Sequence, residues 1–274
     1  MIVIKSLHKF FLKITSYEIT KRQRFILMSF FLTIVLFATQ TVSENIRYQV
    51  MGLMVVSTVL LAIFALWGEL AGIKYFLLLL LPIYFVAGAS LFYFLLPVRW
   101  LTKVPYAFFF GISVYLLMLT SNIYNVAAIR TIALLRAAHA VGLLFSLIAT
   151  FFLGNVLFSL HLPFYLIAGG VVAIVAPLYL VGLWSLELED YISKRVFMYS
   201  LIFTLVTTQI GLVLSFWPIV SINGALVLAT VMYVLLGLAQ FNFENRLKTR
   251  IIWEHLSIAA IVFVIVLIST RWGG

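Results

Sequence analysis

Residues 164–186, FYLIAGGVVAIVAPLYLVGLWSL, contain no charged side chain. A helix of roughly 20 apolar residues crosses the ~30 Å hydrocarbon layer of a bilayer, and this stretch is long enough to do so. Similar apolar stretches recur on both sides of it along most of the chain. The sequence therefore predicts a helical membrane protein, because the strands of a membrane β-barrel would be shorter and would alternate apolar and polar residues.

The composition supports the same class. Of the 274 residues, 65% are hydrophobic and only 9% are charged, whereas a soluble domain has roughly 25% charged residues. We expect an all-α bundle of about nine transmembrane helices that forms a single polytopic domain over residues 25–274. The expected spans are approximately 25–42, 49–68, 75–96, 104–124, 137–160, 164–186, 196–217, 222–240 and 252–270.

Lysine and arginine are distributed unequally between the predicted loops. If all nine spans cross the membrane, 14 of the 18 Lys and Arg residues lie on the same side as the N-terminus. Cytoplasmic loops of membrane proteins are enriched in these residues, so we expect a cytoplasmic N-terminus and an external C-terminus. Because the positive charges border apolar spans, we expect the net charge of +10 to contact anionic lipid headgroups and not nucleic acid.

A basic segment, residues 1–24, precedes the first span. Val3, Leu7, Phe10 and Ile14 recur at helical spacing, with lysines between them. This pattern predicts an amphipathic helix that lies in the cytoplasmic interface of the membrane. The alternative is a disordered basic tail.

A candidate site lies in SNIYNVAAIRTIALLRAAHAVG, residues 121–142, where polar side chains interrupt the apolar chain. If this stretch were one helix, its two asparagines, its second arginine and its histidine would share one face. Two amides, a guanidinium and an imidazole together could bind a carboxylate or a phosphate. The residues predicted to contact an anionic group are Arg130, Arg136, Asn125, Asn122 and His139.

The alternative interpretation of this stretch is a turn at the membrane surface. Residues 104–160 cannot form one helix, because they would reach roughly 85 Å at 1.5 Å per residue. The least apolar section, Asn122–Thr131, is the expected turning point. The asparagines would then be cap or turn residues, and Arg130 and Arg136 would anchor the helix ends to lipid headgroups.

Three other stretches carry polar residues. We interpret ELEDYISKR, residues 187–195, as a solvated loop; its carboxylates could alternatively hold Mg²⁺ on a diphosphate. ENRLKTRIIWEH, residues 244–255, predicts a solvated helical extension with Glu–Lys and Arg–Glu pairs four residues apart. Small and hydroxyl side chains along the 196–217 span predict close packing against another helix; they are Ser200, Thr204, Thr207, Gly211 and Ser215.

The residues give no sign of a catalytic or metal centre. The chain has no cysteine, and its four histidines are not spaced as metal ligands. We therefore predict no catalytic residue, no metal and no cofactor, and the sequence does not indicate an enzyme.

Two short segments are similar to each other. LPIYFVAGA (81–89) and LPFYLIAGG (162–170) are three predicted spans apart. An odd number of spans reverses orientation, as in an inverted-topology repeat. Chance similarity between apolar segments is the alternative.

The stretch NIYNVAAIRTIALLRAA, residues 122–138, resembles a family of uncharacterised bacterial multi-pass membrane proteins that is known only as a domain of unknown function. The resemblance rests on this stretch alone. It implies a multi-pass protein of the prokaryotic plasma membrane, and it implies no activity and no site.

Three functional hypotheses follow. The first is a protein that handles a lipid or a small molecule, such as an uncoupled transporter, with the arginines and Asn125 contacting an anionic group. The second is a non-enzymatic subunit or scaffold that binds another membrane protein. The third is a membrane-embedded transferase acting on a lipid-linked substrate, which requires Glu187, Glu189 or Asp190 to converge on a pocket with the arginines.

Overall fold

The computed structural model describes residues 20–39, 44–66, 72–97, 99–128 and 133–270. This part of the chain folds entirely into helices and turns, as the predicted all-α membrane class requires. The helices are α2 (Lys21–Thr39), α3 (Glu44–Ala65), α4 (Ile73–Leu95), α5 (Trp100–Ala127), α6 (Leu135–Ser159), α7 (Phe164–Glu187), α8 (Lys194–Ser215), α9 (Ser221–Phe243) and α10 (Thr249–Ser269).

Eight of these helices are long and apolar enough to cross a membrane. In α3 the apolar helical stretch is shorter, Gln49–Ala65. The chain is thus a multi-pass helical membrane protein, and the helices match the nine expected spans to within a few residues.

Helix α3 begins at Glu44, five residues before the expected edge at 49, and α2 begins at Lys21 and not at residue 25. Residues 21–24 therefore belong to this helix and not to the predicted interfacial segment, of which residues 1–19 lie outside the described part of the chain. The guanidinium of Arg24 lies 5.4 Å from the ring centroid of Phe64 in α3. A basic residue can extend a membrane helix in this way, because its stem packs on apolar neighbours while its charge stays at the surface.

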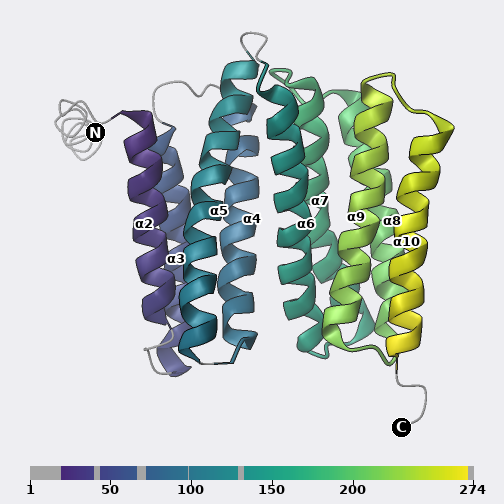
Figure 1. Cartoon of the computed structure of the whole chain (residues 1–274), viewed down its shortest axis with the longest axis horizontal. Helices are drawn as coiled ribbons and strands as arrows, with labels where there is room; N and C mark the ends of the chain where they lie inside the picture. The colour runs from purple at the N-terminus through teal and green to yellow at the C-terminus, as the bar shows by residue number, and fades with distance from the viewer. Residues whose placement is uncertain (1–19, 40–43, 67–71, 98, 129–132, 271–274) are drawn as a thin grey trace.

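The helices lie side by side and alternate in direction (Figure 1). Helices α4, α6, α7 and α9 each contact several others and form the centre of the bundle. Helices α2 and α3 pack at one edge, and α10 packs against α9 at the other edge. Along the described chain, the start of α2 and the end of α10 lie at opposite ends of the bundle.

The contact between α6 and α9 is close because its side chains are small. A Cβ atom at Gly154 would lie 3.5 Å from the Cα of Ala225 in α9. The buried hydroxyls of α6 bond to its own backbone: Ser146 donates to the Gly142 carbonyl, and Thr150 donates to that of Ser146, both at 2.9 Å. The polar groups are therefore satisfied without a gap between the helices.

The small-residue face of α8 packs against α7, as the sequence predicted. Ser200, Thr204 and Thr207 are buried. The Tyr179 hydroxyl of α7 lies 2.7 Å from that of Thr207, and Gly211 lies against the side chain of Val171. This small-residue face is thus a packing face and not the lining of a pathway.

The two similar segments do not occupy equivalent positions. Pro82 lies inside α4, whereas Pro163 is the residue that precedes the first turn of α7. An inverted repeat would place them at corresponding points of two helices. The positions therefore do not support a repeat in this register.

Candidate functional site

Basic residues gather at one end of the bundle, which is the upper end in Figure 1. This end carries the start of α2, the start of α4, and the chain between α5 and α6, α7 and α8, and α9 and α10. We call it the basic end. The Lys and Arg residues whose side chains are described there are Lys21, Arg22, Arg24, Lys74, Arg136, Lys194, Arg195, Arg246, Lys248 and Arg250, against Arg99 and Lys103 at the opposite end.

An open depression of about 630 Å³ lies at the basic end, between the start of α6 and the end of α9. We call it the vestibule. Arg136 and His139 line it from α6, and Glu244 and Arg246 line it from the chain that follows α9. Arg246 and Glu244 form a loose ion pair, with 3.6 Å between nitrogen and oxygen, while the Arg136 side chain is exposed.

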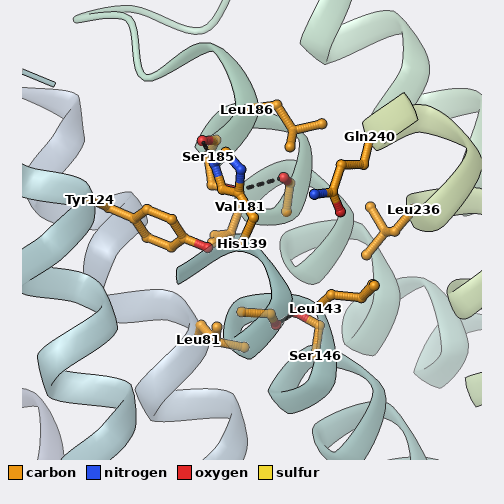
Figure 2. Close-up of a pocket in the computed structure, with 12 residues that line it drawn as sticks. Leu81, Tyr124, His139, Leu143, Ser146, Val181, Ser185, Leu186, Leu236 and Gln240 are labelled. Atoms are coloured by element: carbon orange, nitrogen blue, oxygen red, sulfur yellow. Dashed lines mark hydrogen bonds between the residues drawn. The ribbon is translucent and has the colours of Figure 1, made fainter. Parts of the chain in front are cut away.

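A second, smaller cavity lies deeper in the bundle, and His139 lines both spaces. Its volume is about 20 Å³, which is enough for roughly one water molecule. We call it the inner cavity. Its polar lining residues come from α5, α6, α7 and α9 and point toward one another (Figure 2); they are Tyr124, His139, Ser146, Ser185 and Gln240.

Hydrogen bonds fix the orientation of His139. Its Nε2 atom lies 2.8 Å from the backbone carbonyl oxygen of Ser185 (Figure 2). A carbonyl only accepts, so Nε2 carries a proton and donates it. Nδ1 is then free to accept a hydrogen bond when the ring is neutral. The imidazole thus joins α6 to α7 at the point where the vestibule meets the inner cavity.

Tyr124 holds the other side of His139. Its hydroxyl donates to the Ala138 carbonyl at 2.9 Å, and its ring centroid lies 5.8 Å from that of His139. A side chain at Gly142 would overlap the Tyr124 hydroxyl. The glycine therefore lets α5 approach α6 closely enough for this bond to form.

The structure changes the predicted site in three ways. Asn122 and Asn125 lie in α5, whereas Arg136 and His139 lie in α6, so the four do not share one helix face. The chain does turn between Ala127 and Leu135, but after the asparagines, which are therefore not turn residues. Asn125 is only 3% exposed.

Arg136 and His139 are the predicted residues that line the vestibule. Asn122 and Asn125 are not among its lining residues, and Arg130 lies outside the described residues. Tyr124, Ser185 and Gln240 could not be identified from the sequence, because their proximity depends on how α5, α6, α7 and α9 pack.

The carboxylates at the turn from α7 to α8 interact with other residues of this chain. Asp190 forms an ion pair with Lys74 of α4, and the Glu187 carboxylate accepts a 2.5 Å hydrogen bond from Ser193, whose hydroxyl also caps α8. A hydrogen bond with Glu189, together with its negative charge, raises the pKa of the exposed Tyr191 phenol. None of the three carboxylates is among the residues that line the vestibule, so the condition set by the transferase hypothesis is not met there.

The stretch 244–255 is not one helical extension. Helix α9 ends at Phe243, Asn245 adopts a left-handed backbone conformation with φ of 56°, and α10 begins at Thr249. The predicted helical spacing of Glu244 and Lys248 is therefore wrong. The pair Arg250–Glu254 does form in α10, at 2.9 Å. The turn is what places Glu244 and Arg246 over the vestibule.

The comparison with protein families gave a match to the family described as "Protein of unknown function (DUF5656)" over residues 168–269. This segment includes most of α7 and all of α8 and α9, and it ends with α10. The resemblance to an uncharacterised family is thus confirmed, but residues 122–138 lie outside the matched segment. No curated protein and no solved structure matches the chain.

Proposed function

We propose that this membrane protein binds and handles an anionic lipid or small molecule at its basic end, in the manner of an uncoupled transporter. The observation that carries the proposal is the vestibule, in which Arg136 of α6 and Arg246 of the chain that follows α9 line the same space beside His139. Its volume of about 630 Å³ lies in the range typical of small-molecule sites.

The side chains of the vestibule suit an anionic group. Arg136 and Arg246 each offer several N–H donors in a planar arrangement, which matches phosphate and carboxylate oxygens. Glu244 holds Arg246 at 3.6 Å, a distance that leaves guanidinium donors available to a ligand. His139 lines the same space, and its Nε2 atom is engaged with the Ser185 carbonyl, so the two arginines supply the donors for the anion.

The basic end is proposed to face the cytoplasm of a prokaryotic cell. Cytoplasmic loops favour Lys and Arg, and the cytoplasmic leaflet attracts them through its anionic lipids. The N-terminus would then be cytoplasmic and the C-terminus external. Ion-coupled transporters place charged side chains deep in the membrane. In the helices that the structure describes, the charged side chains lie within about two turns of the helix ends. This distribution supports transport that is not coupled to an ion.

Binding of phosphatidylglycerol to the delipidated protein, followed by native mass spectrometry in detergent, tests the proposal. We expect the wild type to retain one lipid molecule above the nonspecific background. The double variant Arg136→Gln/Arg246→Gln should bind at least roughly 100-fold more weakly, since it loses two charged hydrogen bonds worth about 1.5–3 kcal/mol each. Inorganic phosphate added as a competitor distinguishes a headgroup site from a site for a free anion.

Arg250→Gln is the matched control. This residue lies at the same end but pairs with Glu254 on the exposed side of α10, so its removal should leave binding unchanged. Equal lipid binding by the wild type and the double variant, or an equal loss in the control, would contradict a site in the vestibule. Only the surface charge would then attract lipid.

A further inference from the structure

Helix α8 presents a continuous exposed face on the side opposite to α7. Its apolar members are spaced by three or four residues or multiples of that spacing, so they share one side of the helix. They are Met198, Ile202, Leu205 and Val213 of α8 and Phe216, which directly follows the helix, with exposures between 44% and 68%. Gln209 lies in the middle of this row and is also exposed. We call the row the α8 stripe.

Gln209 is unusual because of its depth. It lies six residues before the end of α8 at Ser215, about 9 Å inside the helix end. A helix that spans the bilayer places a residue at this depth within the hydrocarbon layer. The Gln209 amide offers two donors and one acceptor, and lipid tails can satisfy none of them. In the part of the chain that the structure describes, no residue bonds to this amide.

Three nearby hydroxyl groups already have a hydrogen-bond partner. Thr207, Thr208 and Thr230 each donate to the backbone carbonyl four residues earlier, at 2.7–2.8 Å. These side chains are satisfied within their own helix and require no partner. The amide of Gln209 is left to find one outside the chain.

An apolar groove of about 420 Å³ runs beside the stripe, between α8, α9 and α10. Gln209 and Val213 line it from α8, and Phe263 lines it from α10. Helix α10 packs mainly on α9, so this flank of the bundle is open. The groove gives room for side chains of a second helix laid along α8.

We propose that the α8 stripe is the contact face for a second copy of this chain, with the two Gln209 amides hydrogen-bonded to each other. Two copies inserted in the same orientation are related by an axis along the membrane normal. Such an axis brings the same residue of both copies together at one depth. An amide is both donor and acceptor, so Gln209 is complementary to itself. One polar residue in an apolar helix pair also fixes the register of the pair.

Cysteine cross-linking tests the contact in native membranes, since the chain has no cysteine of its own. We expect oxidation to join two copies carrying Leu205→Cys or Phe216→Cys. The control is Ile261→Cys in α10, whose exposure of 58% is similar to the 53% of Leu205 and which lies at a similar depth. The stripe variants should cross-link at least five-fold more than the control.

The contribution of Gln209 is measured in the Leu205→Cys background. Gln209→Leu should reduce the cross-linked fraction several-fold, and Gln209→Asn, which keeps an amide, should retain more of it. Equal cross-linking at Ile261→Cys, no cross-linking at either stripe position, or no effect of Gln209→Leu would each overturn the proposal. Cross-linking only to a different polypeptide would overturn it too, in favour of a foreign partner.

Discussion

Helices α6 and α10 are both long and apolar enough to cross a membrane, yet α6 lies at the centre of the bundle and α10 at its edge (Figure 1). The buried face of α6 is rich in small residues, among them Gly142, Ala149 and Gly154. In α10 only His255 and Val266 are buried. Apolar length therefore indicates that a helix enters the membrane, whereas small residues indicate which helices pack closely within it.

The largest effect is expected from Gly154→Leu at the contact between α6 and α9. A leucine there would have to displace the α9 backbone, because Ala225 Cα lies 3.5 Å from the Cβ position. We expect a cost of about 3 kcal/mol, at the upper end of the usual range for overpacking, and a loss of monodisperse protein. Size-exclusion chromatography after heating in detergent measures it. Gly154→Ala, which meets only ordinary van der Waals distances, is the control and should fold normally.

Gly142→Ala should have the next largest effect. The added methyl group would displace the Tyr124 hydroxyl and weaken its bond to Ala138, at a cost of about 1–3 kcal/mol. In a Tyr124→Phe background the same substitution should cost clearly less, because the overlapping oxygen is gone. Thermal midpoints of the four proteins give the coupling. Strictly additive costs would mean that the glycine does not serve this contact.

Gly237→Ala would create a similar steric overlap between α9 and α10, at the edge of the bundle. The new Cβ would lie 2.5 Å from Nε2 of His255 in α10. Because α10 is held mainly on one side, it can shift, and we expect a cost of no more than about 1 kcal/mol. The thermal midpoint in the same assay measures it. A cost above that of Gly142→Ala would show that α10 is fixed as firmly as α6.

Ile265→Ala in α10 should have the smallest effect. The side chain is 53% exposed, and lipid replaces the contacts that it loses, so the change should stay within about 0.5 kcal/mol. Val266→Ala, at the buried neighbouring position, should cost more. If both substitutions lower the thermal midpoint equally, the exposed side of α10 is covered by protein.

The positions of the helices could be predicted from sequence because each depends on a local property, the length of an apolar run. The span predicted at 164–186 is helix α7, Phe164–Glu187. The packing face of α8 could also be read from its small residues. The end of α5 was placed too early, because Asn122 and Asn125 resemble turn residues but lie within the helix, where Asn125 is buried and Asn122 is half-buried.

The candidate site was predictable only in part. Arg136 and His139 were identified because charged or titratable side chains are rare in this chain. Glu244 and Arg246 looked like a solvated extension, and their place over the vestibule depends on the left-handed turn at Asn245. Gln240 and Ser185 both line the inner cavity because of the way α6, α7 and α9 pack. No local sequence pattern predicts this packing.

The close contact of α6 with α9 has a consequence for biosynthesis. Ala225 follows Gly154 by 71 residues in the chain, so at synthesis rates of 5–20 residues per second it emerges roughly 4–15 s later. During that delay α6 lies in the bilayer without α9, the helix that it contacts most extensively. The hydroxyls of Ser146 and Thr150 donate hydrogen bonds to the backbone of α6 itself. Before α9 is inserted, these two side chains therefore expose no unsatisfied donor to lipid or to the insertion machinery.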